Sequence, residues 1–317
     1  MPALPDTPPL TAPDAAGLPP ADWVIDAALV RSLLAEQHPD LAALPLRHVA
    51  SGFDNETFRL GDALAVRLPR RAVSAPLSLH EQTWLPLVAP GLPVAVPLPL
   101  RVGQASARYP CAWSVLPWFE GEPADTVRPA DAPALAASLA QFLAALHRPA
   151  PEHAPINPYR GVALVQRQAV AEERFAGLAG KGCVTPQVRR AWDAALALAP
   201  EGPPVWIHGD LHPLNLLLHQ GRLSAVIDWG DMARGDAACD LAALWMLFDD
   251  AAARAAAMRA YAQASIAVHP AVTDRTWVRA RGWAVLFGVF LAGIGDPARS
   301  RLAAIGVKTL RRIGQER

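Results

Sequence analysis

One segment of the chain, residues 205–231 with the sequence VWIHGDLHPLNLLLHQGRLSAVIDWGD, gathers the side chains that could do chemistry. Asp210 follows a His-Gly pair, Asn215 comes five positions later, and Asp228 begins an Asp-Trp-Gly sequence. Carboxylate and amide oxygens are hard ligands that suit Mg²⁺, and a further carboxylate can accept the proton of an attacking hydroxyl group. These residue types together suit phosphoryl transfer, in which catalysis consists mainly of positioning and charge neutralisation.

A hairpin would bring these three side chains together. Two β-type runs flank a Gln220-Gly221 turn, and their pairing would place Asn215 and Asp228 at the same open end, with Asp210 in the loop just before it. Because an ordinary aspartate has a pKa of about 4, we expect Asp210 to orient the hydroxyl group and take its proton late. Asn215 and Asp228 are the expected metal ligands, with Asp228 bridging to the β- and γ-phosphates.

The part of the chain before residue 120 has the pattern of a sheet. Short apolar runs between Leu46 and Leu68, interrupted by glycine and polar residues, are typical of antiparallel hairpins. Residues 75–88 have helical spacing, and the proline-rich region 94–117 suits edge strands and turns. We expect a small, mainly antiparallel sheet with one prominent helix.

The rest of the chain is dominated by alanine-rich helical segments, at residues 130–147, 166–178, 187–198 and from 239 to the end. The change in character places a domain boundary near residue 120 and predicts an α+β fold of two lobes. Residues 23–119 would form the small N-terminal lobe and 120–317 the larger, mainly helical C-terminal lobe. The proline-rich residues 1–22 are expected to be a loose arm.

Composition narrows the class of protein. The 317 residues include 29 basic and 29 acidic side chains, so the charge balance predicts neither a nucleic-acid nor a membrane partner. The N-terminus lacks the pattern of a signal peptide, and the longest apolar run, residues 283–294, is too short to cross a bilayer and predicts a buried helix. Three widely spaced cysteines suit reduced thiols. We expect a soluble, cytoplasmic monomer or homodimer.

The two motifs HGDLHPLN and IDWGD, at this spacing, resemble the catalytic and metal-binding segments of the aminoglycoside phosphotransferase family. That family has the protein-kinase fold, whose corresponding motifs are HRDxxxxN and DFG. The resemblance extends from about residue 46 to residue 295. It implies a two-lobed kinase-like fold, ATP or GTP as co-substrate, Mg²⁺ as cofactor and a small hydroxyl-bearing acceptor.

The resemblance also implies a nucleotide site in the N-terminal lobe. Ser51, Gly52, Phe53 and Asn55 lie where the family has the turn that covers the phosphates, although the full glycine-rich pattern is missing. An isolated turn of this kind would be read as an ordinary hairpin turn.

Arg67, at the end of the run 63–68, lies where the family has the basic residue that binds the α- and β-phosphates, normally a lysine. Strand alternation puts Arg67 on the face opposite Val66 and Leu68, so it can point into a cleft while they face the core. Glu81 is the implied partner that orients it. Solvated positions are the alternative for both charged residues.

The segment 114–121, with Leu116 and Trp118, lies where the family's hinge contacts the nucleobase through its backbone. Asp240 matches a family aspartate that supports the catalytic loop through hydrogen bonds, and His208 is expected to fix the same loop.

The acceptor is left open between an aminoglycoside-like antibiotic and a small metabolite. A polycationic aminoglycoside would require an acidic wall near Asp210, for which the sequence offers Asp231, Asp236, Asp249, Asp250, Glu172 and Glu173. The alternative from another class is a catalytically silent kinase fold that serves as a nucleotide sensor or scaffold. A protein kinase is disfavoured because neither an Ala-Pro-Glu segment nor an activation-loop stretch follows Asp228.

Overall fold

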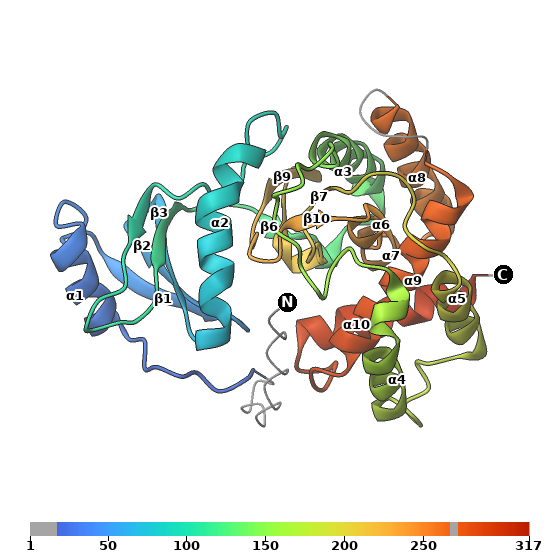
Figure 1. Ribbon diagram of the computed structural model, residues 1–317, viewed down its shortest axis with the longest axis horizontal. Helices are drawn as coiled ribbons and strands as arrows, with labels where there is room; N and C mark the ends of the chain where they lie inside the picture. The colour runs from blue at the N-terminus through green and yellow to red at the C-terminus, as the bar shows by residue number, and fades with distance from the viewer. Residues whose placement is uncertain (1–17, 267–271, 317) are drawn as a thin grey trace.

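The computed structural model describes residues 18–266 and 272–316, and most of the predicted arm at residues 1–22 lies outside them. Two lobes lie side by side in Figure 1: a sheet with two helices on the left and a mainly helical body on the right. The predicted α+β, kinase-like fold is confirmed. The predicted boundary near residue 120 stays a prediction.

The N-terminal lobe is a five-stranded antiparallel sheet in the order β1-β2-β3-β5-β4. The strands are β1 (Leu46–Ser51), β2 (Asn55–Leu60), β3 (Leu64–Pro69), β4 (Arg101–Gly103) and β5 (Trp113–Pro117). Only two short strands form within the predicted region 94–117, as its prolines lead one to expect. The expected helix is α2 (Ala75–Val88), which begins after the 3₁₀ turn η1 (Ala72–Ser74).

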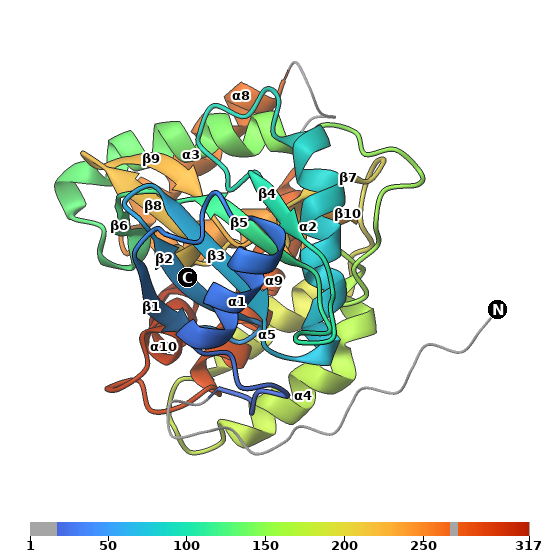
Figure 2. The ribbon, with the colours of Figure 1, turned by 90° about the vertical axis from the view of Figure 1, so that its left-hand side faces the viewer.

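A second helix of this lobe, α1 (Ala27–Gln37), was not predicted from the sequence. Its buried residues Val30, Leu33 and Leu34 have helical spacing, and the Asp26 side chain caps it by accepting from the Leu29 N–H at 2.8 Å, so a signal for it was present. Figure 2 shows α1 in front of the sheet strands. These three residues share a hydrophobic core with strand residues that include Val66 and Leu68.

The C-terminal lobe has its largest core between helices α3 to α10 and two small sheets, one of order β6-β8-β9 and one pairing β10 with β7. The strands are β6 (Glu122–Pro123), β7 (Val205–Ile207), β8 (Leu216–His219), β9 (Arg222–Val226) and β10 (Ala233–Gly235). The helices are α3 (Ala132–Leu146), α4 (Gln168–Gly177), α5 (Pro186–Leu196), α6 (Ala238–Leu241), α7 (Ala243–Leu247), α8 (Ala251–Ser265), α9 (Asp274–Ala292) and α10 (Arg301–Gln315), with 3₁₀ turns η2 (Ala124–Thr126), η3 (Pro129–Asp131), η4 (Leu164–Arg167) and η5 (Pro213–Asn215).

Two local predictions for this lobe are confirmed. β8 and β9 pair as the expected hairpin, and Gln220 and Gly221 turn the chain with φ angles of 50° and 72°. The apolar run 283–294 lies mostly within α9, whose residues from Trp283 to Val289 are buried. No helix in the described ranges is long and apolar enough to span a membrane.

The packing of β4 against β5 offers a test of the N-terminal lobe. A Cβ atom added at Gly103 would lie 1.8 Å from Cε2 of the fully buried Trp113, so we expect Gly103→Ala to destabilise the protein by about 1–3 kcal/mol through overpacking. The free energy of unfolding would be measured with denaturant. Gly177→Ala is the control, because a Cβ atom there meets nothing within 4 Å. Equal unfolding midpoints for the two variants would contradict this account of the packing.

Candidate active site

The loop that carries Asp210 runs from the end of β7 to the start of β8, and a buried carboxylate holds it in place. Asp240, at the start of the C-terminal helices, accepts hydrogen bonds from the backbone N–H groups of His208 at 2.7 Å and Gly209 at 2.9 Å. Gly209 has a φ angle of 86°, and a Cβ atom there would lie 2.6 Å from the Asp231 carbonyl oxygen, so this position requires glycine. The expected support of the loop by Asp240 is confirmed.

His208 joins the two sequence motifs. Its Nε2–H donates to the Ile227 carbonyl oxygen at 3.1 Å, and its Nδ1 accepts from the Asp210 N–H at 3.2 Å. Burial lowers the pKa of His208, which favours the neutral ring that this pattern of one donor and one acceptor needs. The ring also packs edge-on against Trp229, with 4.7 Å between centroids. The expected loop-fixing role of His208 is therefore confirmed.

Asn215 and Asp228 lie at the same end of the β8–β9 hairpin, as the sequence predicts. The Ile227 N–H donates to the Asn215 carbonyl oxygen at 2.9 Å, and the Asn215 side-chain Nδ2 donates to the Asp210 carbonyl oxygen at 2.8 Å. Asp228 has a φ angle of 65°, an uncommon value for a residue other than glycine, and its side chain is 49% exposed. The three expected residues are thus neighbours, and the Asp228 carboxylate is accessible.

Arg67 points from β3 toward the C-terminal lobe. Its Nη1 lies 2.9 Å from Oε2 of Glu81 on α2, and its Nη2 lies 2.5 Å from Oδ1 of Asp228. The Asn55 side chain is assigned with its amide oxygen toward Arg67, where it accepts from Nε and Nη2 at 3.0 Å, because that orientation satisfies both groups. Arg67 and Glu81 are not solvated surface residues in this structure, since Glu81 is buried and Arg67 is partly buried in their common ion pair.

The carboxylates around Arg67 raise its pKa. Burial acts to lower the pKa of Arg67, but the neighbouring carboxylates of Asp228 and Glu81 outweigh it and raise that pKa above its ordinary value. Burial raises the pKa of Glu81, opposed by the Arg67 charge. The Glu81 carboxylate also accepts the Trp229 N–H at 3.3 Å, so α2 contacts the Asp-Trp-Gly motif directly.

The β1–β2 turn is held by side chains of the next segment. Arg70 donates to the Gly52 carbonyl oxygen and Arg71 to that of Phe53, both at 3.0 Å. The Ser51 hydroxyl group donates to Glu56 at 2.7 Å. The carbonyl oxygens of the turn are therefore engaged in holding its shape, and Asn55 is the residue of this turn that reaches Arg67.

The predicted hinge residues lie beside the sheet rather than beside Asp210. Leu116 is buried on β5, opposite Ala65 of β3. Trp118 donates its backbone N–H to the Ala63 carbonyl oxygen at 2.8 Å and its ring Nε1–H to Glu120 at 3.0 Å. Both N–H donors of Trp118 are thus engaged, so a direct contact of this residue to a nucleobase would have to use its carbonyl oxygen or its ring face.

Arg160 and Asn157 were not predicted from the sequence, whereas Asp231 was among the acidic residues offered for a wall near Asp210. Arg160 lies in the loop between α3 and η4. Its Nη2 atom is 3.4 Å from Oδ1 of Asp210 and 3.7 Å from Oδ2 of Asp231. Asp231 also accepts from Nδ2 of Asn157 at 2.6 Å. Burial raises the pKa of Asp231 to about 6, with the negative charge of Asp210 adding to the effect. Arg160 lies outside both motifs, so no local pattern could have marked it.

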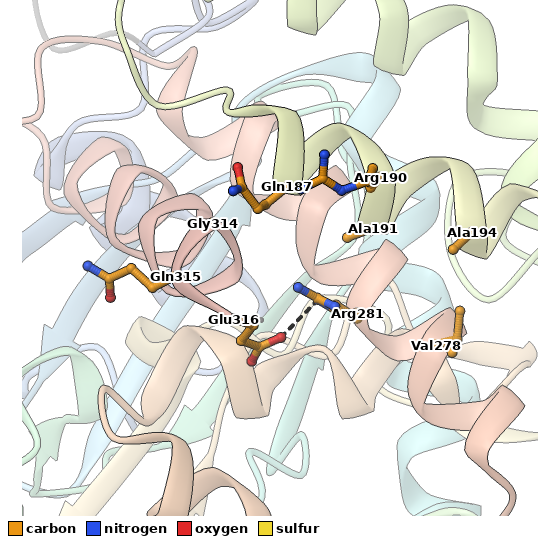
Figure 3. Close-up of a pocket in the computed structure, with 9 residues that line it drawn as sticks. All are labelled: Gln187, Arg190, Ala191, Ala194, Val278, Arg281, Gly314, Gln315 and Glu316. Carbon is orange, nitrogen blue, oxygen red and sulfur yellow. Dashed lines mark ion pairs between the residues drawn. The ribbon is translucent and has the colours of Figure 1, made fainter.

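Two cavities lie elsewhere in the C-terminal lobe. One of about 320 Å³ opens between α5, α9 and the end of α10, where Arg281 and Glu316 form a 2.9 Å ion pair at its wall (Figure 3). The other, of about 480 Å³, is lined by residues that include the buried pair Asp236 and Arg279. Asp210, Asn215 and Asp228 line neither cavity.

Comparisons with known proteins agree with this arrangement. Among solved structures, the chain is similar to the aminoglycoside phosphotransferase APH(2″)-IIIa with GDP and kanamycin: 18% identity, 90% of this chain and 98% of that one, TM-score 0.66. It is also similar to macrolide 2′-phosphotransferase MphH from Brachybacterium faecium, with 24% identity over 89% and 97% of the two chains and a TM-score of 0.57. The comparison with curated proteins found no match. A model of the phosphotransferase enzyme family matches residues 45–283. The prediction of a phosphotransferase is confirmed, and the chain belongs to the phosphotransferase enzyme family.

Proposed function

We propose that this protein transfers the γ-phosphate of ATP or GTP to a hydroxyl group of a small molecule, an aminoglycoside-like antibiotic or a small metabolite, in a reaction that uses Mg²⁺. The observation that carries the proposal is the meeting of Asp210, Asn215 and Asp228 at one end of the β8–β9 hairpin, opposite the Arg67–Glu81 pair. Solved structures with a similar fold contain GDP with kanamycin, ADP, or ATP with streptomycin. They support a nucleotide co-substrate but do not distinguish ATP from GTP.

Asp210 would act on the acceptor. Its carboxylate is one quarter exposed, and the loop below it is fixed by Asp240 and Asn215. The carboxylate would hold the acceptor hydroxyl group in line with the γ-phosphorus and take its proton as the new O–P bond forms and the bond to the leaving nucleoside diphosphate breaks. Arg160, beside Asp210, keeps this carboxylate from being an isolated negative charge.

The donor set fits magnesium. Asn215 uses its Nδ2 as a donor and leaves its amide oxygen available, and Asp228 offers an exposed carboxylate of which only Oδ1 has a partner in the described structure. Oxygen-only ligands of this kind are typical of Mg²⁺ sites that keep several waters and phosphate oxygens. When bound there, the metal would neutralise charge on the phosphate groups.

The N-terminal lobe, residues 23–119, would bind the nucleotide, and residues 120–317 would provide catalysis and acceptor binding. Arg67 would contact the α- and β-phosphates, and the β1–β2 turn from Ser51 to Asn55 would cover them through its backbone. Leu116 and Trp118 would lie beside the base. A cytoplasmic location and a monomeric or homodimeric state stay predictions.

Asp210→Asn tests the chemical role. The amide keeps the size of the side chain but cannot accept the proton, so kcat should fall by about 10²–10⁴-fold while the KM for nucleotide changes little. The measurement is a coupled assay of nucleotide consumption with acceptor present. His219→Gln, at the exposed end of β8, is the control. A wild-type kcat in the Asp210→Asn variant would show that Asp210 takes no part in the chemical step. Turnover that the substitution abolishes would exclude the catalytically silent alternative.

Asp228→Ala tests the metal site. Loss of the carboxylate should weaken binding of the magnesium nucleotide by at least about tenfold and make binding insensitive to Mg²⁺. Calorimetric titration of nucleotide with Mg²⁺ or with EDTA measures both effects. Asp62→Ala, an exposed carboxylate in the β2–β3 turn, is the control. Retained Mg²⁺ dependence in Asp228→Ala would contradict the assignment.

Two substitutions of Arg67 distinguish the need for its positive charge from the need for its planar guanidinium group. Arg67→Lys keeps a cation between Glu81 and Asp228 and should retain substantial turnover, whereas Arg67→Met leaves Glu81 buried without a counter-charge. For the Met variant we expect kcat/KM for nucleotide to fall by about 10²-fold, together with a lower unfolding midpoint. If the Lys variant is as inactive as the Met variant, the fork of the guanidinium rather than its charge is what the site needs.

A further inference from the structure

The acidic wall that a polycationic acceptor would need is not assembled around Asp210. Of the six acidic residues that the sequence offers for it, Asp231 is the one that shares a partner with Asp210, because both contact Arg160, and Asp231 is also bound by Asn157. The others are engaged elsewhere or lie on the outer surface: Asp236 with Arg279, Asp249 with Arg312, Asp250 as the cap of α8, Glu172 with Arg189, and Glu173 exposed on α4.

Two arginines occupy this neighbourhood instead. Arg160 lies over the ring of Phe287 on α9, with 5.0 Å between the guanidinium carbon and the ring centroid, and reaches Asp210. Arg167, at the end of η4, lies over the ring of Tyr159 at the same distance of 5.0 Å. Tyr159 precedes Arg160 in the chain, so the two guanidinium groups belong to one small structural unit.

The turn that carries Arg160 is fixed in place. Nδ2 of Asn157 donates to both the carboxylate and the carbonyl oxygen of Asp231, and Gly161 has a φ angle of 63° against β10. A Cβ atom at Gly161 would lie 2.5 Å from Ile207 and 3.0 Å from Gly235, so this turn packs closely against β7 and β10 and requires glycine. Arg160 is therefore positioned beside Asp210 before any substrate arrives.

Arg167 carries a charge that no neighbour balances. Among residues 18–266 and 272–316 it has no ion pair or hydrogen bond, and its Nε is buried without a partner. Burial lowers the pKa of Arg167, and the positive charge of Arg160 adds to this effect. Arg160 is already paired with the carboxylates of Asp210 and Asp231, whereas the half-buried charge of Arg167 lacks an anionic partner among the described residues, so an anionic ligand would stabilise it. Guanidinium groups bind carboxylate and phosphate oxygens in a planar fork.

We propose that the acceptor of this phosphotransferase carries an anionic group, a carboxylate or a phosphate, in addition to its hydroxyl group, and that Arg160 and Arg167 bind this anion next to Asp210. The inference rests on the proposed function and specifies the substrate class of the same site. Arg160 would then have two contacts, one with the Asp210 carboxylate and one with the anion, which would bring the hydroxyl group of the acceptor to the base.

The binding test uses the full-length protein saturated with Mg²⁺ and a nonhydrolysable ATP analogue, so that the nucleotide phosphate sites are filled. Calorimetry with inorganic phosphate as the probe should show saturable binding that Arg167→Gln weakens by about tenfold or more and Arg167→Lys largely keeps. Arg174→Gln is the matched control, because Arg174 stacks on Phe290 of α9 in the same manner. No saturable binding, or equal weakening by the Arg167→Gln and Arg174→Gln variants, would overturn the proposal.

A turnover test compares acceptor charge directly, with glycerate and glucose 6-phosphate as anionic acceptors and kanamycin as the polycation. We expect nucleotide consumption to rise with at least one anionic acceptor and the KM for that acceptor, not for nucleotide, to rise about tenfold in Arg167→Gln. Turnover of kanamycin in preference to both anions would reject the anionic acceptor and leave the phosphotransferase intact. Failure of the ATP analogue to bind with Mg²⁺ would instead count against the proposed function itself.

Discussion

The guanidinium group of Arg67 joins the two lobes, and the geometry of the site depends on it. It binds Glu81 of α2 on one side and Asp228 of the C-terminal lobe on the other, with Asn55 of the β1–β2 turn as a third partner. Glu81 is 4% exposed, so removal of the cation would leave a carboxylate buried without compensation, at a cost of about 3–5 kcal/mol. Arg67 therefore connects the sheet, α2 and the Asp-Trp-Gly motif, together with the Glu81 carboxylate, which also accepts from the Trp229 N–H.

Environment gives the carboxylates of the site different tasks. Burial works against the charge of Asp240, but hydrogen bonds and the charge of His147 outweigh it and lower the pKa of Asp240, so it stays an acceptor for the catalytic loop. Burial instead raises the pKa of Glu81 and that of Asp231. Asp228 is the most exposed of these carboxylates at 49%, whereas Asp210 and Asp231 are about equally exposed, at 24% and 23%. The two fully buried carboxylates, Glu81 and Asp240, hold Arg67 and the loop of Asp210 in place through ion pairs and hydrogen bonds.

The parts of this site that could be predicted from the sequence are local. Hairpin pairing follows from two β-type runs around a glycine turn, and the orientation of Arg67 follows from strand alternation, because both depend on neighbours in the chain. Arg160 reaches Asp210 from 50 residues away through the docking of a loop onto β10, and no periodicity records that contact. The missed helix α1 is different, since its apolar spacing and its Asp26 cap were visible in the sequence. Sequence patterns report local propensity, so they do not predict contacts that form only when distant segments pack together.

The arginine at position 67, where kinases have lysine, is consistent with the geometry around it. A lysine ammonium group is a compact charge, whereas the three nitrogens of the guanidinium group contact Glu81, Asp228 and Asn55 at the same time. The chain has only two lysines, Lys181 and Lys308, and neither lies in the site. The permanently charged cations that contact the site, Arg67 and Arg160, are therefore arginines, which stay charged when buried and bind oxygen pairs through a planar fork. A site built from such groups is suited to phosphate and carboxylate oxygens, and the chemistry proposed for Arg67 with the nucleotide is the same as that proposed for Arg160 and Arg167 with an anionic acceptor.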